Sequence, residues 1–151
     1  MLLFSPAFSE GAPIPARHTC DGENISPALS WEAAPADTRF FALICDDPDA
    51  PSGVWDHWLL FNLPAEHTRL DEGVSDDFAP FPGAAHGLNS WKNAKYQGPC
   101  PPSGTHRYYF TLYALDARLS LKPGATKPEI LRAMDGHIIA EARLMGRYSR
   151  G

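Results

Sequence analysis

Two polar segments that lie far apart in the chain carry most of the side chains that could do chemistry. The first is DPDAP at residues 47–51, followed by Trp55 and His57. The second is GPCPPSGTHRYY at residues 98–109. Each joins an apolar run to a proline-rich turn, where the end of a strand can direct a side chain into a pocket. The imidazole, phenol and carboxylate groups of these segments suit the binding of a small anion better than nucleophilic catalysis.

Four residues are predicted to form this anion site, namely Asp47, His57, His106 and Tyr108. Imidazole titrates near neutral pH, so two histidines can donate to phosphate or carboxylate, and the phenol adds a neutral donor. In extended backbone His106 and Tyr108 share a face. A carboxylate suits an anion site only if it orients a histidine, shares a proton with the ligand or meets a cationic group. A ligand with both phosphate and ammonium would satisfy both signs of charge.

Arg107 lies between His106 and Tyr108 in the chain and is expected to face the opposite side. An ion pair with Asp49 or another acid suits its guanidinium group. Other readings of these residues stay open. The aspartates of the DPDAP segment could simply cap backbone amides in a turn, and His57 could be a structural histidine. A metal site formed by Asp47, His57 and His106 is another open reading, but no metal-ligand spacing is found, so neither a metal nor a cofactor is predicted.

An enzyme is the first alternative, because Cys100 and Ser103 lie close to His106 and could serve a hydrolase. No Gly-x-Ser-x-Gly motif is present, and the neighbouring prolines leave few backbone donors for an oxyanion hole. The sequence therefore favours a binding protein without catalytic activity. The second alternative is a protease or kinase inhibitor that acts through a surface loop, for which the polar segment from Asp71 to Gly87 is the candidate.

The composition favours one domain, residues 1–151, with a buried core. A formal net charge of -5 gives no electrostatic reason to expect nucleic acid or an anionic membrane as partner. No signal peptide and no membrane-spanning run is recognised, which predicts a cytoplasmic protein without membrane insertion. Three widely spaced cysteines then predict reduced thiols, with Cys100 in a packing role.

Fifteen prolines and twelve glycines spread along the chain indicate many short strands joined by stiff turns. One helix is predicted after Thr126, where Glu129 completes a capping box, and helical spacing continues through Ile138 and Ile139 unless Gly136 ends it. Together these features predict an all-β fold, an antiparallel β-sandwich with one small C-terminal helix. The expected strands are Phe40 to Cys45, His57 to Asn62, Tyr108 to Leu115 and a final one from Ala142, with weaker candidates at Leu2 to Phe4 and Ala28 to Trp31.

Several long motifs resemble the phosphatidylethanolamine-binding proteins. They are the two polar segments described above, CDGENISPALSW at residues 20–31 and GHIIAEARLMGRYSR at residues 136–150. The last two look like the bacterial branch of this family, often called Raf-kinase-inhibitor-like. The spacer at residues 52–54 is shorter than in eukaryotic members, and a tyrosine that walls their pocket has no counterpart here.

The resemblance implies a β-sandwich with a small anion pocket lined by Asp47, His57, His106 and Tyr108. Gly98 and Pro99 match the rim of that pocket, whereas Asp49, Trp55 and Arg107 match supporting residues. The Ala50–Pro51 bond resembles a turn in which the peptide bond is cis. The implied ligand is a small anion or a phosphorylated group, the implied role is regulation or inhibition of a partner enzyme, and homodimers occur in the bacterial branch.

Overall fold

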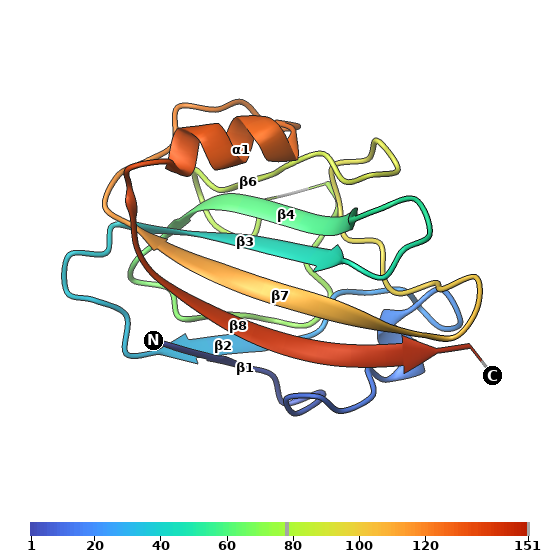
Figure 1. Cartoon of the computed structure of the whole chain (residues 1–151). Coiled ribbons are helices and arrows are strands. Elements are labelled where there is room, and N and C mark those ends of the chain that lie inside the picture. The colour runs from blue at the N-terminus through green and yellow to red at the C-terminus, as the bar shows by residue number, and fades with distance from the viewer. Residues whose placement is uncertain (78, 151) are drawn as a thin grey trace.

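The computed structural model describes residues 1–77 and 79–150, in which two antiparallel β-sheets and one α-helix are found (Figure 1). The small sheet has the order β1-β2-β5, and the large sheet has the order β6-β4-β3-β7-β8. The predicted β-sandwich with one small helix is therefore confirmed. The elements in chain order are β1 (Leu2–Phe4), a short 3-10 helix η1 (Ala16–His18), β2 (Leu29–Glu32), β3 (Phe40–Asp47), β4 (Trp55–Pro64), β5 (Arg69–Leu70), β6 (Ala85–His86), β7 (Thr105–Leu115), α1 (Lys127–Met134) and β8 (Ile138–Ser149).

The central strands of the large sheet read as continuous apolar runs because both of their faces are buried. Figure 1 shows β1 and β2 on one side of this sheet and α1 on the other. Between the sheets lies the main core, in which Leu43 and Trp58 pack with side chains of the small sheet. A second cluster joins Ile44 and Leu59 to Ile130 of the helix. A strand covered on both sides has no reason to alternate polar with apolar residues.

The helix begins where the capping box predicts. The backbone N–H of Thr126 donates to Glu129 Oε1 at 2.9 Å, and the N–H of Glu129 donates to Thr126 Oγ1 at 3.4 Å. The helix ends at Met134, so Ile138 and Ile139 do not continue it, and the alternative that Gly136 ends the helix is the one the structure supports. Gly136 has a φ of 82°, a left-handed conformation that stops the helix. Ile138 then pairs with Leu115 and opens β8.

Four strands are longer than the sequence predicts, and in three of them the added residues matter for the site. β3 extends to Asp47, β4 begins at Trp55, and β7 begins at Thr105. Asp46 lies opposite Tyr109 and Asp47 opposite Trp55, which brings the DPDAP segment between the starts of β4 and β7. The predicted loop from Asp71 to Gly87 contains the short strand β6, which pairs with β4. Its other described residues form neither helix nor strand.

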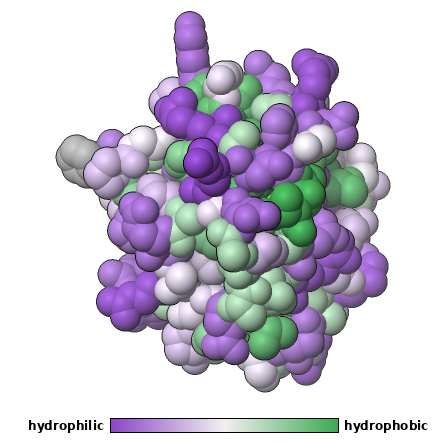
Figure 2. All heavy atoms as spheres, turned by 90° about the vertical axis from the view of Figure 1, so that its left-hand side faces the viewer, coloured by the Kyte–Doolittle hydropathy of each residue, from purple (hydrophilic) through white to green (hydrophobic). Residues whose placement is uncertain are grey.

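The surface is mixed in character. Figure 2 shows one end of the molecule, where hydrophilic residues cover most of the face and hydrophobic residues appear in small patches. Exposed large apolar side chains occur on β1 and at the start of β8, including Leu2, Phe4 and Ile138. Within the described part of the chain, no helix combines the length and the apolar character needed to cross a lipid bilayer.

Candidate functional site

A cavity of about 180 Å³ opens where the β3–β4 loop, the start of β7 and the proline-rich segment at residues 100–102 meet. It brings together the four residues predicted to form the anion site, and Trp55 lies beside them. The cavity is small compared with a typical drug-sized pocket of about 300–1,000 Å³ and therefore suits a small group. Its lining consists of Asp47, Ala50, Pro51, Ser52, Trp55, His57, Trp91, Cys100, Pro101, Pro102, His106 and Tyr108.

Asp47 orients His106. The Nδ1 atom of His106 lies 2.6 Å from Asp47 Oδ2, and both side chains are buried. The other carboxylate oxygen of Asp47 accepts a hydrogen bond of 2.7 Å from the backbone N–H of Asp49. Both oxygens of Asp47 are thus engaged by the protein, so the negative charge is directed at a histidine and a turn. A carboxylate in an anion site can orient a histidine, share a proton with the ligand or meet a cationic group. The geometry here supports the first of these roles.

His57 is held by a backbone carbonyl. Its Nδ1 atom lies 2.7 Å from the oxygen of Gln97. The ring meets Tyr108 edge-on, with centroids 5.2 Å apart, and Trp91 edge-on at 5.0 Å. Burial lowers the pKa of His57, and the Gln97 carbonyl and the charge of Asp47 oppose this effect. The net shift is downward, which favours the neutral ring.

The hydroxyl of Tyr108 lacks a hydrogen-bond partner among the described residues, although the side chain is only 1% exposed. Burial raises the pKa of this phenol, and the charge of Asp47 raises it further. The backbone N–H of Cys100 offsets part of this rise in the pKa. A buried polar group without a partner is costly and calls for an explanation. Here the group belongs to a residue of the cavity wall and remains a neutral donor.

Gly98 and Pro99 are not among the residues that line the cavity. Instead their backbones anchor the proline-rich segment to the segment that contains Cys20 and Asn24. The N–H of Gly98 donates to Asn24 Oδ1 at 2.8 Å, and the carbonyl of Pro99 accepts from the N–H of Cys20 at 3.1 Å. A Cβ atom at Gly98 would collide with the backbone oxygen of His18, so only glycine fits this approach.

Asp49 and Arg107 form the ion pair expected from the sequence. Two nitrogens of the guanidinium group contact the carboxylate at 2.7 and 2.8 Å, and the backbone N–H of Arg107 adds a third bond of 2.9 Å. The hydrogen bonds from Arg107 hold the pKa of Asp49 at about 2. This pair fastens the β3–β4 loop to β7. The cis bond expected at Ala50–Pro51 is wrong, because no cis peptide bond occurs among the described residues.

The prediction of reduced thiols is also wrong, because Cys20 and Cys100 form a disulfide. The two residues are 80 positions apart, and spacing in the sequence could not indicate their pairing. A disulfide sulfur carries no thiolate, so Cys100 cannot serve as the nucleophile of a hydrolase. The remaining cysteine, Cys45, is buried, and burial raises the pKa of its thiol.

Sequence reasoning missed several residues of the site. Trp91 meets both Trp55 and His57 edge-on, with centroids 5.5 and 5.0 Å away. Pro101 and Pro102 line the cavity, although the sequence indicates only a turn at these positions. Gln97 acts through its backbone carbonyl, which no side-chain pattern can indicate. For Trp91, the one signal in the sequence is that it is a large aromatic residue within a polar loop.

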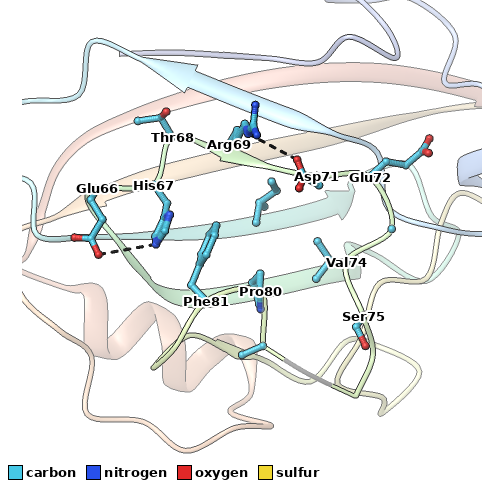
Figure 3. Close-up of a pocket in the computed structure, with 13 residues that line it drawn as sticks. Glu66, His67, Thr68, Arg69, Asp71, Glu72, Val74, Ser75, Pro80 and Phe81 are labelled. Atoms are coloured by element: carbon cyan, nitrogen blue, oxygen red, sulfur yellow. Dashed lines mark ion pairs between the residues drawn. The ribbon is translucent and has the colours of Figure 1, made fainter.

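A larger hollow of about 610 Å³ lies elsewhere, along β5 and the segment that follows it. Figure 3 shows two ion pairs among its side chains, Glu66 with His67 at 3.9 Å and Arg69 with Asp71 at 3.7 Å. His67 also stacks on Phe81 with ring centroids 3.7 Å apart. Among the described residues, none of the buried polar atoms that lack a partner belongs to its lining. The smaller cavity is therefore the better candidate for a ligand site.

Comparisons with known proteins agree with this architecture. Residues 4–149 match the model of the family "Phosphatidylethanolamine-binding protein". A "UPF0098 protein" of Methanothermobacter thermautotrophicus is 54% identical over 151 residues, covering both chains completely, and one of Chlamydia trachomatis is 45% identical with 99% of each chain covered.

Solved structures are similar as well. The chain matches a phosphatidylethanolamine-binding protein homologue of Chlamydia trachomatis with a TM-score of 0.92 and 44% identity, covering 99% of this chain and 97% of the other. It matches Escherichia coli YbcL, described as a new member of the mammalian PEBP family, with a TM-score of 0.92 and 30% identity, covering 99% of this chain and 98% of the other.

Proposed function

The chain belongs to the phosphatidylethanolamine-binding protein family, and we propose that it is a non-enzymatic protein that binds phosphate or a phosphorylated group in the cavity between His57, His106 and Tyr108. The observation that carries this proposal is the Tyr108 hydroxyl. It is buried in the cavity wall without a hydrogen-bond partner among the described residues, and a phosphate oxygen is a suitable acceptor for it.

The arrangement around the hydroxyl supports the same ligand. His57 and His106 each use Nδ1 for a bond to the protein, which leaves Nε2 of each ring available for a ligand. Arg107 and Asp49 neutralise each other away from the cavity. The cavity volume of about 180 Å³ would hold a group the size of several water molecules, each occupying about 30 Å³ in the liquid.

Hydrolysis is less well supported than binding. The sulfur of Cys100 is engaged in the disulfide, and Ser103 is exposed and does not line the cavity. No other serine or cysteine of the lining contacts a histidine of the site through a hydrogen bond in the described structure. A nucleophile activated by an adjacent base is the usual requirement for covalent hydrolysis.

We also propose that the protein regulates or inhibits a partner enzyme, with a phosphorylated side chain of that enzyme as one form of the ligand. The partner, a homodimer, a bacterial origin and a cytoplasmic location stay predictions. Disulfides are rare in the cytosol of mesophiles. Because Cys20 and Cys100 form a disulfide, the cysteines of this chain do not support a cytoplasmic location.

Titration followed by NMR of the histidine rings tests the binding proposal. We expect inorganic phosphate and phosphoethanolamine to shift the signals of His57 and His106 at ligand concentrations of about 1 mM. His137, which is paired with Asp116 on the surface, serves as the internal control. If neither ligand moves the two cavity histidines more than it moves His137, the proposal is wrong.

A further inference from the structure

The loop between β6 and β7 reaches the histidine His57 at two points. Trp91 lies on the cavity wall beside the ring, and the carbonyl oxygen of Gln97 lies 2.7 Å from Nδ1 of His57. A backbone carbonyl can only accept, so Nδ1 is the donor in this contact and Nε2 is left for the cavity. The orientation of the imidazole ring therefore depends on what holds this loop in place.

A buried side chain, that of Asn89, holds the loop together. It is only 3% exposed. Its Oδ1 atom accepts from the backbone N–H groups of Trp91 at 2.9 Å and Asn93 at 3.1 Å. Its Nδ2 atom donates to the carbonyl of Lys95 at 3.0 Å and to Oε1 of Gln97 at 2.9 Å. The amide thus uses two acceptor positions and both of its donors, which is its full hydrogen-bonding capacity.

We infer that Asn89 is a positioning residue for His57, because it fixes the two parts of the loop that touch the imidazole ring. This inference rests on the proposed function and adds to it a residue that does not line the cavity. Asn89 acts on the ligand site through Gln97 and Trp91, along two separate routes.

The first route runs through Gln97. Its Oε1 atom accepts from Asn89 and also, at 2.8 Å, from Nδ2 of Asn93. Its backbone pairs with His57: the N–H of Gln97 donates to the His57 carbonyl at 3.2 Å, and the His57 ring donates to the Gln97 carbonyl. The side chain of Gln97 is therefore fixed by the loop while its carbonyl holds the ring, so a shift of the loop would move the carbonyl away from Nδ1.

The second route runs through Trp91. Its backbone N–H is bound by Asn89, and its ring meets the His57 ring edge-on with centroids 5.0 Å apart. The neighbouring Ser90 ties this part of the loop to the start of β4, because its N–H donates to the Asp56 carbonyl at 2.9 Å and its Oγ accepts from the Asp56 N–H at 2.8 Å. The loop is thus attached to β4 next to His57, and Asn89 sets how the tryptophan meets the histidine.

The contact with Gln97 also has an electrostatic consequence. Burial lowers the pKa of His57, and the Gln97 carbonyl opposes this effect because it accepts a hydrogen bond that favours the charged ring. Without the carbonyl the pKa would fall further, and fewer molecules would carry the imidazolium that donates to an anion. The other titratable groups near the ring are Asp47 of β3, Asp56 of β4, and His106 and Tyr108 of β7.

The variant Asn89→Ala tests the inference, by NMR titration of the histidine rings with pH and by calorimetric titration with inorganic phosphate. We expect the pKa of His57 to fall and that of His106 to stay as in wild type, because Asp47 and not the loop holds His106. The affinity for phosphate near neutral pH should fall roughly fivefold. This difference should narrow as the pH falls through the pKa values of His57 in the two proteins, since the ring is then charged in both.

Asn62→Ala is the matched control. Asn62 is a buried asparagine toward the other end of β4, and its side chain bonds to the backbone of Leu119 at 2.8 and 2.9 Å. This variant should lose stability without a change in the His57 pKa or in phosphate affinity. If both variants weaken binding equally, or if Asn89→Ala weakens it with an unchanged His57 pKa, Asn89 has only a structural role and the inference is wrong, while the proposed function stands.

Gln97→Ala gives a second test that does not require Asn89→Ala to fold. It removes the side-chain acceptor of Asn89 but keeps the backbone carbonyl that faces His57. We expect the pKa of His57 to fall in the same direction by a smaller amount, and an unchanged pKa would overturn the inference. If the wild-type protein binds no phosphate, the proposed function fails, whereas the His57 pKa values of the variants still decide whether Asn89 positions the ring.

Discussion

Asp47 and His106 lie 59 positions apart in the chain, and the carboxylate of the first accepts a hydrogen bond of 2.6 Å from Nδ1 of the second. The pair connects the end of β3 to the start of β7, the two strands from which the polar segments emerge. The orientation of one cavity histidine therefore depends on a residue from the other polar segment.

Replacing Asp47 by alanine should destabilise the fold. The change removes the acceptor of His106 Nδ1 and of the Asp49 backbone N–H; His106 is buried, and Asp49 is half-buried. Leaving a buried polar group unpaired costs about 1–3 kcal/mol, and we expect a loss of that size in the free energy of unfolding measured with urea. Asp37→Ala, at an exposed turn, is the control and should change stability by less than about 0.5 kcal/mol. Equal effects of the two variants would contradict this account.

Loss of the hydroxyl should affect the free energy of unfolding differently at two buried tyrosines, Tyr108 and Tyr96. Tyr108→Phe should leave the free energy of unfolding within about 0.5 kcal/mol of wild type or increase it, because no described residue pairs with that hydroxyl. The same variant should bind phosphate about tenfold more weakly. Tyr96→Phe should cost about 1 kcal/mol of stability, because its hydroxyl donates to the His18 carbonyl at 2.6 Å. Urea denaturation and phosphate titration measure both effects, and a Tyr108→Phe protein with undiminished affinity would exclude the hydroxyl from binding.

The ion pair between Asp49 and Arg107 should make stability depend on pH in the acid range. The pKa of Asp49 falls from its ordinary 3.8 to about 2 in the folded protein. A lowered pKa contributes stability above pH 3.8, and this contribution is lost as the pH falls through about 2. Asp49→Asn should therefore be less stable than wild type near neutral pH, and the gap should close under acid. The check is urea denaturation at about pH 6 and about pH 2, with the exposed Asp71→Asn as control. A gap of constant size would show that the pair does not act through this ionisation.

The disulfide can be tested by counting thiols. Protein purified without reductant should show no reactive thiol when folded, because Cys45 is buried, and one when denatured. Reduction should then expose all three cysteines. Closing an 80-residue separation limits the unfolded chain, and we expect the double variant Cys20→Ser with Cys100→Ser to lose about 2–4 kcal/mol of stability. Three reactive thiols in unreduced, denatured protein would rule the disulfide out.

Features that depend on near neighbours in the chain could be predicted. The apolar run from Phe40 to Cys45 marks a strand because its length and composition are local properties, and the capping box of Thr126 and Glu129 marks a helix start for the same reason. The end of that helix was harder to predict. Ile138 and Ile139 have helical spacing, but a strand partner in β7 and the left-handed Gly136 outweigh that local preference.

The amino-acid sequence alone indicated which groups could meet, namely the carboxylate of Asp47, two imidazoles and the phenol of Tyr108. Tertiary structure alone decided how they meet. The Gln97 carbonyl that sets the proton position on His57 is 40 positions away in the chain, and the partner of Cys100 is 80 positions away. Such contacts arise from the register of paired strands and the path of loops between them, which no local pattern of residue types encodes.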